Sequence, residues 1–143
     1  MSKYPVEVLD DEEDNGTMPA NVAELEKEIV GHKIVNAHLA KELKYDWSDK
    51  LYDVFEIVLD NGKRVQLLDG GDCCAYTEVK SFLLNPDKVD HIITGIGTTD
   101  GYTTWHIYAD LGDILSLTVG WSAGNPFYYG YGFDIRVKEI DGK

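Results

Sequence analysis

TGIGTTDGYTTWHIYADLGDILSLTVGWS, residues 94–122, is the segment around which the rest of this chain is organised. Threonine, aromatic and β-branched residues dominate residues 103–109 and 114–121, and these residue types favour strands. A short polar break at residues 110–113 joins the two segments, so we expect them to pair as neighbouring strands. The glycine-rich residues 97–102 come just before them and are expected to form a loop.

Other strands are predicted on both sides of this stretch. Residues 54–59 and 64–68 flank Asp60-Asn61-Gly62, which is typical of a tight hairpin turn. The remaining strand candidates are residues 33–39, 89–96 and 128–137.

Two helices are also predicted. The first begins at Pro19 and ends at Gly31, because apolar residues recur at helical spacing between a proline and a glycine. The second begins after Asp72, a good N-terminal cap, and ends at Asn85-Pro86. Its apolar face would hold Cys73, Tyr76, Val79, Phe82 and Leu83.

The expected fold class is therefore α+β. We predict a mainly antiparallel sheet of about six to seven strands with two helices packed against it. Residues 19–143 would form this single domain. Residues 1–18 contain the acidic run DDEED and are expected to be a mobile, solvated segment, with docking on a partner as the alternative.

Composition excludes several classes of function. The chain has 143 residues, of which 13 are basic and 26 acidic, and its formal net charge is −13. A nucleic-acid partner or an anionic membrane surface would need a basic footprint, so neither is expected. A basic protein surface remains a possible partner, although acidity also serves solubility. We find neither a membrane-spanning apolar run nor a signal peptide, and we expect a cytoplasmic protein.

The two cysteines are adjacent, Cys73 and Cys74. A disulfide between neighbours would close a small, strained ring, so two free thiols in a reducing compartment are expected. Small buried side chains are the favoured interpretation. A reactive thiolate at a helix N-terminus is the alternative.

Known catalytic and ligand-binding motifs are incomplete in this chain. Gly95, Gly97 and Gly101 do not have dinucleotide-binding spacing, and a strand rather than a helix follows them. Cys73 could be combined with a histidine and an aspartate, but such sets are generic in a chain with so many acidic residues. No catalytic residue, metal site or cofactor is therefore assigned.

Aromatic residues are concentrated in the last third of the chain and suggest a binding surface. Tyrosine and tryptophan at strand ends often anchor protein interfaces, and they equally often close the end of a core. His106 shares a strand face with Thr104 and Tyr108, beside the glycine-rich loop. The candidate binding residues are Asp72, Cys73, Asp100, Tyr102, Trp105, His106, Tyr128 and Tyr129.

Three blocks of sequence are similar to a known family. GDCCAYTEV (residues 71–79), DHIITGIGTTDGYTTWHIYADLGDIL (90–115) and VGWSAGNPFYYGYGFDI (119–135) resemble small uncharacterised proteins encoded by phages of actinobacteria. The resemblance covers roughly residues 30–138 and carries no catalytic residue. It implies a phage accessory protein that works in the cytosol of a bacterial host.

Two functions follow as hypotheses. The first is a small acidic binding module that acts on a host protein, using residues 100–106, the aromatic residues and the acidic segment. The second is a small-molecule or metal-binding domain or an enzyme that uses Asp72 and Cys73 together with Asp100 and His106. The second hypothesis requires Cys73, Asp100 and His106 to surround one cleft.

Overall fold

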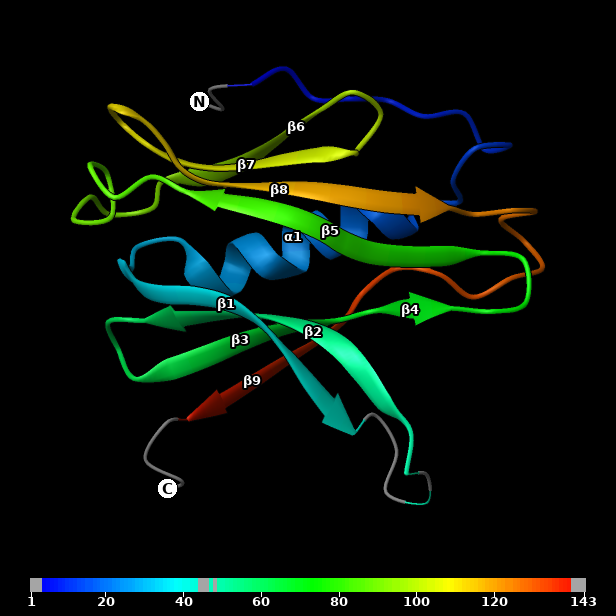
Figure 1. Ribbon diagram of the computed structural model, residues 1–143. Coiled ribbons are helices and arrows are strands. Elements are labelled where there is room, and N and C mark those ends of the chain that lie inside the picture. The colour runs from blue at the N-terminus through cyan, green and yellow to red at the C-terminus, as the bar shows by residue number, and fades with distance from the viewer. Residues whose placement is uncertain (1–3, 44–46, 48, 140–143) are drawn as a thin grey trace.

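The computed structural model describes residues 4–43, 47 and 49–139. Within these residues the fold is mostly β, with one helix and nine strands in two sheets (Figure 1). The predicted α+β fold of one sheet with two helices is therefore wrong, although the antiparallel pairing was predicted. The elements are α1 Thr17–Ile29, β1 Ile34–Leu43, β2 Leu51–Leu59, β3 Lys63–Leu68, β4 Gly70–Gly71, β5 Tyr76–Leu84, β6 Gly95–Thr99, β7 Thr104–Ala109, β8 Gly112–Ser122 and β9 Asp134–Glu139.

Every strand pair in the two sheets is antiparallel. The first sheet has the order β1-β2-β3-β9 and contains the predicted hairpin, in which Val54 pairs with Leu68 and Val58 with Arg64. The second has the order β4-β5-β8-β7-β6 and contains the stretch 94–122. The short β4 and the long β8 therefore belong to the same sheet, and β6 forms one of its edges.

The predicted second helix is a strand, β5. Its core-facing residues are Thr77, Val79, Phe82 and Leu84, so their spacing is two, three and two. The step of three arises because the register of β5 against β8 shifts between Val79 and Ser81. Such a bulge adds one residue to one strand, and the resulting spacing resembles one turn of a helix. Eight pairs of residues with β8 then hold the segment extended.

Two other boundaries were wrong. The predicted strand 89–96 begins too early, because residues 86–90 form turns and β6 begins only at Gly95. β6 then continues to Thr99, so the first half of the predicted loop 97–102 is strand. The predicted strand 128–137 is a hydrogen-bonded loop up to residue 133, and only Asp134–Glu139 pairs as β9 with β3. β6 is set by its hairpin pairing with the nearby β7, whereas β9 is set by its pairing with the distant β3.

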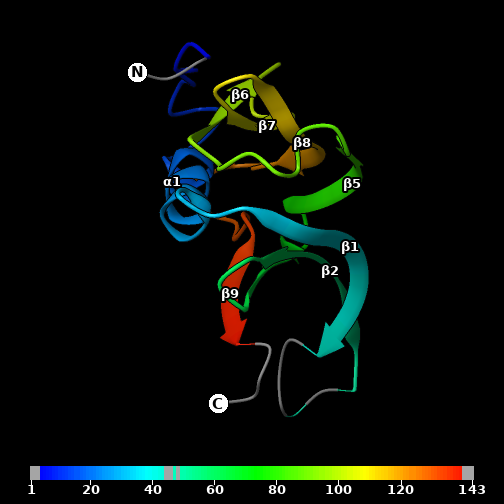
Figure 2. The ribbon, with the colours of Figure 1, turned by 90° about the vertical axis from the view of Figure 1, so that its left-hand side faces the viewer.

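The core lies between the two sheets and α1. Figures 1 and 2 show the helix at the level between the sheets, along one side of the molecule. Leu25 and Ile29 of α1, Phe55 and Leu67 of the first sheet and Trp105 of the second are fully buried there. Burial of such side chains contributes about 1.5–3 kcal/mol each, so this core is the main source of stability.

The acidic segment before α1 makes specific contacts. The Asp14 carboxylate accepts hydrogen bonds from the amides of Thr17 (3.1 Å) and Met18 (3.3 Å), the first residues of the helix. Asp14 also accepts a bond from the Tyr131 hydroxyl and is only 4% exposed. These contacts connect the beginning of α1 to the loop before β9. The mobility of residues 1–18 stays a prediction, and Asp14 offers a direct test of it.

Candidate functional site

Residues 123–132, between β8 and β9, form a loop that is hydrogen-bonded along its length. The Asn125 side chain accepts a bond from the Phe127 amide (3.2 Å), and its carbonyl accepts bonds from the Tyr128 and Tyr129 amides (2.9 and 3.2 Å). From outside the loop, the Asn15 side chain donates to the Pro126 carbonyl (2.7 Å). The backbone of the loop is therefore fixed in several places.

Two aromatic rings project from this fixed loop into solvent. Phe127 is 73% exposed and Tyr128 is 79% exposed. A shallow pocket of about 260 Å³ lies beside Phe127, lined by Asp11 and Glu12 of the acidic segment and by residues 124–127. We call Asp11, Glu12, Phe127 and Tyr128 the aromatic–acidic patch. It combines apolar area with negative charge on a loop whose backbone is held in place.

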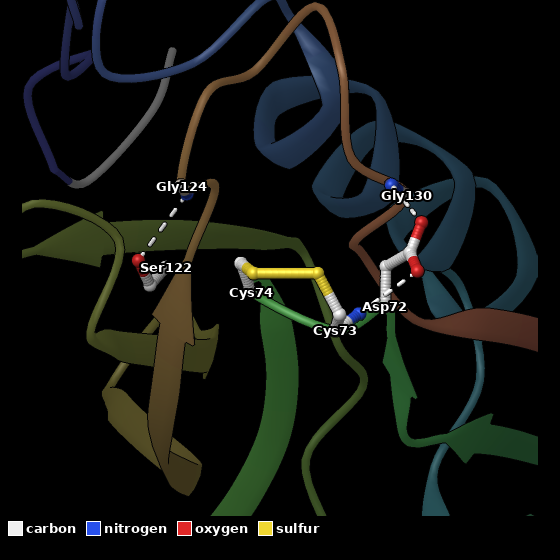
Figure 3. The surroundings of a disulfide bond; sticks show 6 residues. All are labelled: Asp72, Cys73, Cys74, Ser122, Gly124 and Gly130. Carbon is white, nitrogen blue, oxygen red and sulfur yellow. Dashed lines mark hydrogen bonds between the residues drawn. A yellow bond between two sulfur atoms is a disulfide. The ribbon is translucent and has the colours of Figure 1, made fainter.

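Asp72 and Cys73 lie on the β4–β5 turn next to the same loop (Figure 3). Asp72 accepts a 2.8 Å bond from the Cys73 amide and a longer one, 3.5 Å, from the Gly130 amide. The prediction of free thiols is wrong, because a disulfide joins Cys73 to Cys74. The thiol-based argument for a reducing compartment therefore no longer holds. Both cysteines are exposed rather than buried under a helix.

His106, on β7 between β6 and β8 of the second sheet, belongs to a second network. Its Nδ1 lies 2.8 Å from an oxygen of Asp113, and its Nε2 lies 2.9 Å from the Thr99 hydroxyl. The ring of Tyr4 stacks on the imidazole with ring centres 4.3 Å apart. The Tyr4 hydroxyl donates a 2.6 Å bond to the other oxygen of Asp113. Only 16% of the His106 side chain is exposed, so little of the strand face that it shares with Thr104 and Tyr108 is open to solvent at this position.

Glu7 completes this second network at the β6–β7 turn. Its carboxylate accepts bonds from the amides of Gly101 (2.8 Å) and Tyr102 (2.9 Å). Burial opposes ionisation of Glu7, but hydrogen bonds from Thr98 and these two amides, together with nearby His106, outweigh it and lower its pKa. Burial and the neighbouring Glu7 charge raise the pKa of Tyr102.

The candidate residues of the β6–β7 hairpin have different surroundings. Trp105 is fully buried and donates its indole N–H to the Tyr102 carbonyl (2.9 Å). Tyr102 is also buried, whereas Asp100 is exposed in the turn. Trp105 and Tyr102 therefore support the hairpin from inside, and ligand contact through their rings would need the core to open.

The structure therefore divides the candidate residues into two groups. The first group lies at the loop 123–132, which contains Tyr128 and Tyr129 and is contacted by Asp72, next to Cys73. The second group is centred on His106, which contacts Thr99, Asp113 and Tyr4. Within the described part of the chain, no group of three or more histidine, cysteine, aspartate or glutamate residues is arranged to hold a metal ion. Among the described residues, α1 has 13 residues and does not meet the length and hydropathy expected of a membrane-spanning helix.

Comparison with known proteins identifies the family of this chain. A family model for a domain of unknown function, DUF7448, matches residues 27–135. The chain belongs to the DUF7448 family. The matched part of this DUF7448 protein contains both sheets up to the beginning of β9, whereas Asp11, Glu12 and most of α1 lie before it. No curated protein and no solved structure matches the chain.

Several residues of the DUF7448 protein's aromatic–acidic patch and of the network around His106 were not among the predicted site residues. Tyr4 and Glu7 contact residues about a hundred positions away, and local sequence patterns carry no information about such pairs. Asp113 was placed only in the polar break at residues 110–113. Phe127 belonged to the recognised aromatic cluster, and its position between proline and tyrosine in a turn-forming stretch was the signal that could have identified it.

Proposed function

We propose that this DUF7448 protein is a binding module that recognises a basic protein segment through its aromatic–acidic patch. The observation that carries the proposal is the exposure of Phe127 and Tyr128 on a loop held by hydrogen bonds. Large apolar rings left in solvent on a fixed backbone are typical anchors of protein interfaces, because little conformational entropy is lost when they are covered.

The charge around the rings indicates the chemistry of the partner. Asp11 and Glu12 line the pocket next to Phe127, and the whole chain carries a net charge of −13. An arginine or lysine could place its charged group over an aromatic face and pair with a carboxylate at the same time. A negative field of this size also accelerates encounter with a basic partner and repels nucleic acids.

The identity of the partner as a host protein rests on the resemblance to phage-encoded proteins. The same resemblance supports action in the cytoplasm of a bacterial host. The family description adds no activity, so the patch itself is what an experiment must address.

The test is binding of a fluorescent arginine-rich decapeptide, followed by anisotropy at two salt concentrations. Changing Phe127 and Tyr128 together to serine should weaken binding at least tenfold without changing the net charge. The matched control is Leu83→Ser, because Leu83 is similarly exposed (71%) on β5. Equal affinity of the Phe127/Tyr128 variant and the control would show that only overall charge attracts the peptide, and the proposal would be wrong.

A second pair of variants separates local from overall charge. Asp11→Asn with Glu12→Gln and Asp87→Asn with Asp90→Asn remove the same charge from exposed positions. Only the first pair should weaken binding beyond the general salt effect. A host-lysate pull-down with the wild type and the Phe127/Tyr128 variant then identifies proteins whose capture depends on the patch.

A further inference from the structure

The β6–β7 turn has the backbone of an anion-binding site. Three consecutive residues adopt left-handed φ angles: Asp100 (59°), Gly101 (68°) and Tyr102 (62°). This conformation is uncommon for residues other than glycine and is often found where a backbone is arranged for function. Successive backbone amides in a turn can form a concavity that binds an anion. Here the Gly101 and Tyr102 amides both donate to the carboxylate of Glu7, which shows that the concavity accepts a carboxylate.

Residues 4–7, which we call the arm, lie over a groove that continues from this turn. The Tyr4 ring covers Gly97 so closely that a Cβ atom on Gly97 would be 2.4 Å from it. The same ring stacks on His106, and the Tyr4 hydroxyl donates a hydrogen bond to Asp113. The surface formed by Gly97 and His106 therefore binds the Tyr4 ring. The turn beside it binds the carboxylate of Glu7, three residues further along the arm.

The arm occupies this groove incompletely. A pocket of about 300 Å³ remains between the arm, Val22 and Glu26 of α1, and residues 96–98 of β6. Val6 lies at the rim of the pocket but is 81% exposed. A ligand with larger apolar side chains between its ring and its carboxylate would fill more of the pocket and would gain about 25 cal/mol for each Å² of apolar surface buried.

We propose that this groove is a binding site for an acidic peptide of a partner protein, and that the arm is a tethered competitor which occupies it. The peptide places a carboxylate on the Gly101 and Tyr102 amides and an aromatic ring on Gly97 and His106. The unfilled pocket favours a partner peptide over the arm of a second copy, which would bring the same proline and valine. The site is distinct from the aromatic–acidic patch, and its ligand has the opposite charge.

Because the arm is covalently attached to the domain, it competes strongly with any free peptide for the groove. A segment attached by a short linker has an effective concentration in the millimolar range, so a free peptide competes poorly with it. Weakening the arm should therefore increase affinity for a free peptide at least tenfold. The full-length variant is Tyr4→Ala with Glu7→Gln, and Glu7→Gln alone is a milder second variant in case the first folds poorly.

The experiment measures anisotropy of two labelled peptides with the wild type and both variants. One peptide has the chain's own sequence SKYPVEVLD, and the other is SKYLLEVLD, with leucines beside the carboxylate. The expected result is binding to both variants, at least tenfold tighter than to the wild type for the double variant, with the leucine peptide tighter than the native one. A control peptide, SKAPVQVLD, lacks the ring and the carboxylate and should not bind.

Three results would overturn the proposal. Absence of peptide binding by either folded variant would show that the groove is not a site. Equal binding of the control peptide would show that neither the ring nor the carboxylate is recognised. Tighter binding of the native peptide than of the leucine peptide would assign the groove to the arm of a second copy instead of a partner.

Discussion

Asp14 provides the sharpest test of how the acidic N-terminal segment behaves. Replacing it by alanine removes the carboxylate that accepts from the Thr17 and Met18 amides and from the Tyr131 hydroxyl. Loss of a capping side chain costs about 1 kcal/mol. Loss of a hydrogen bond to a charged group costs roughly 1.5–3 kcal/mol. The free energy of unfolding should therefore fall by roughly 2.5–4 kcal/mol, since the residue is almost fully buried.

Urea unfolding followed by circular dichroism measures this change. Asp11→Ala is the matched control, because Asp11 belongs to the same acidic run but is exposed, and it should remain within about 0.5 kcal/mol of the wild type. Asp14→Asn keeps an acceptor for the helix amides but removes the charge, so it should lose only about 1 kcal/mol.

A double-mutant cycle with Tyr131→Phe isolates the contact between the segment and the loop. The two changes should be non-additive by about 1 kcal/mol or more, because each removes the same bond. If Asp14→Ala is as harmless as Asp11→Ala, the segment is a mobile tail as its composition predicts. The reasoning from these contacts would then be refuted.

Three further predictions address the second sheet. The pKa of Glu7 is lower in the folded protein than its ordinary value of 4.5. Ionised Glu7 therefore stabilises the fold fully above pH 4.5, and this contribution is lost as the pH falls through the pKa of the folded state. The stability difference between the wild type and Glu7→Gln, measured by urea unfolding, should shrink below pH 4.5. Trp105→Ala should lower the free energy of unfolding by about 3–5 kcal/mol, because it empties a fully buried site, and a loss under 1 kcal/mol would contradict its place in the core. Gly97→Ala should displace the Tyr4 ring and speed nitration of Tyr4 by tetranitromethane, measured by peptide mass spectrometry, whereas Gly130→Ala, which meets no atom within 4 Å, should not; equal nitration of Tyr4 in both variants would argue against this packing.

Local patterns were sufficient where neighbours in sequence are also neighbours in space. The first helix, the hairpin around Asn61-Gly62 and the pairing of the strands in the stretch 94–122 were predicted correctly, because turn chemistry and apolar spacing act over a few residues. The second helix was predicted wrongly, because the bulge near Lys80 gave β5 a helix-like spacing. That bulge exists only because β8 is the partner of β5.

The candidate sites depended still more on tertiary structure. Composition and local patterns were enough to predict the acidity of the chain, its antiparallel strands and the aromatic concentration that includes Phe127 and Tyr128. They did not predict that there are two sheets, that Trp105 is buried, or that Glu7 reaches the Gly101 amide. The contact between Glu7 and Gly101 joins residues far apart in the chain, and its energy arises only after folding has brought them together.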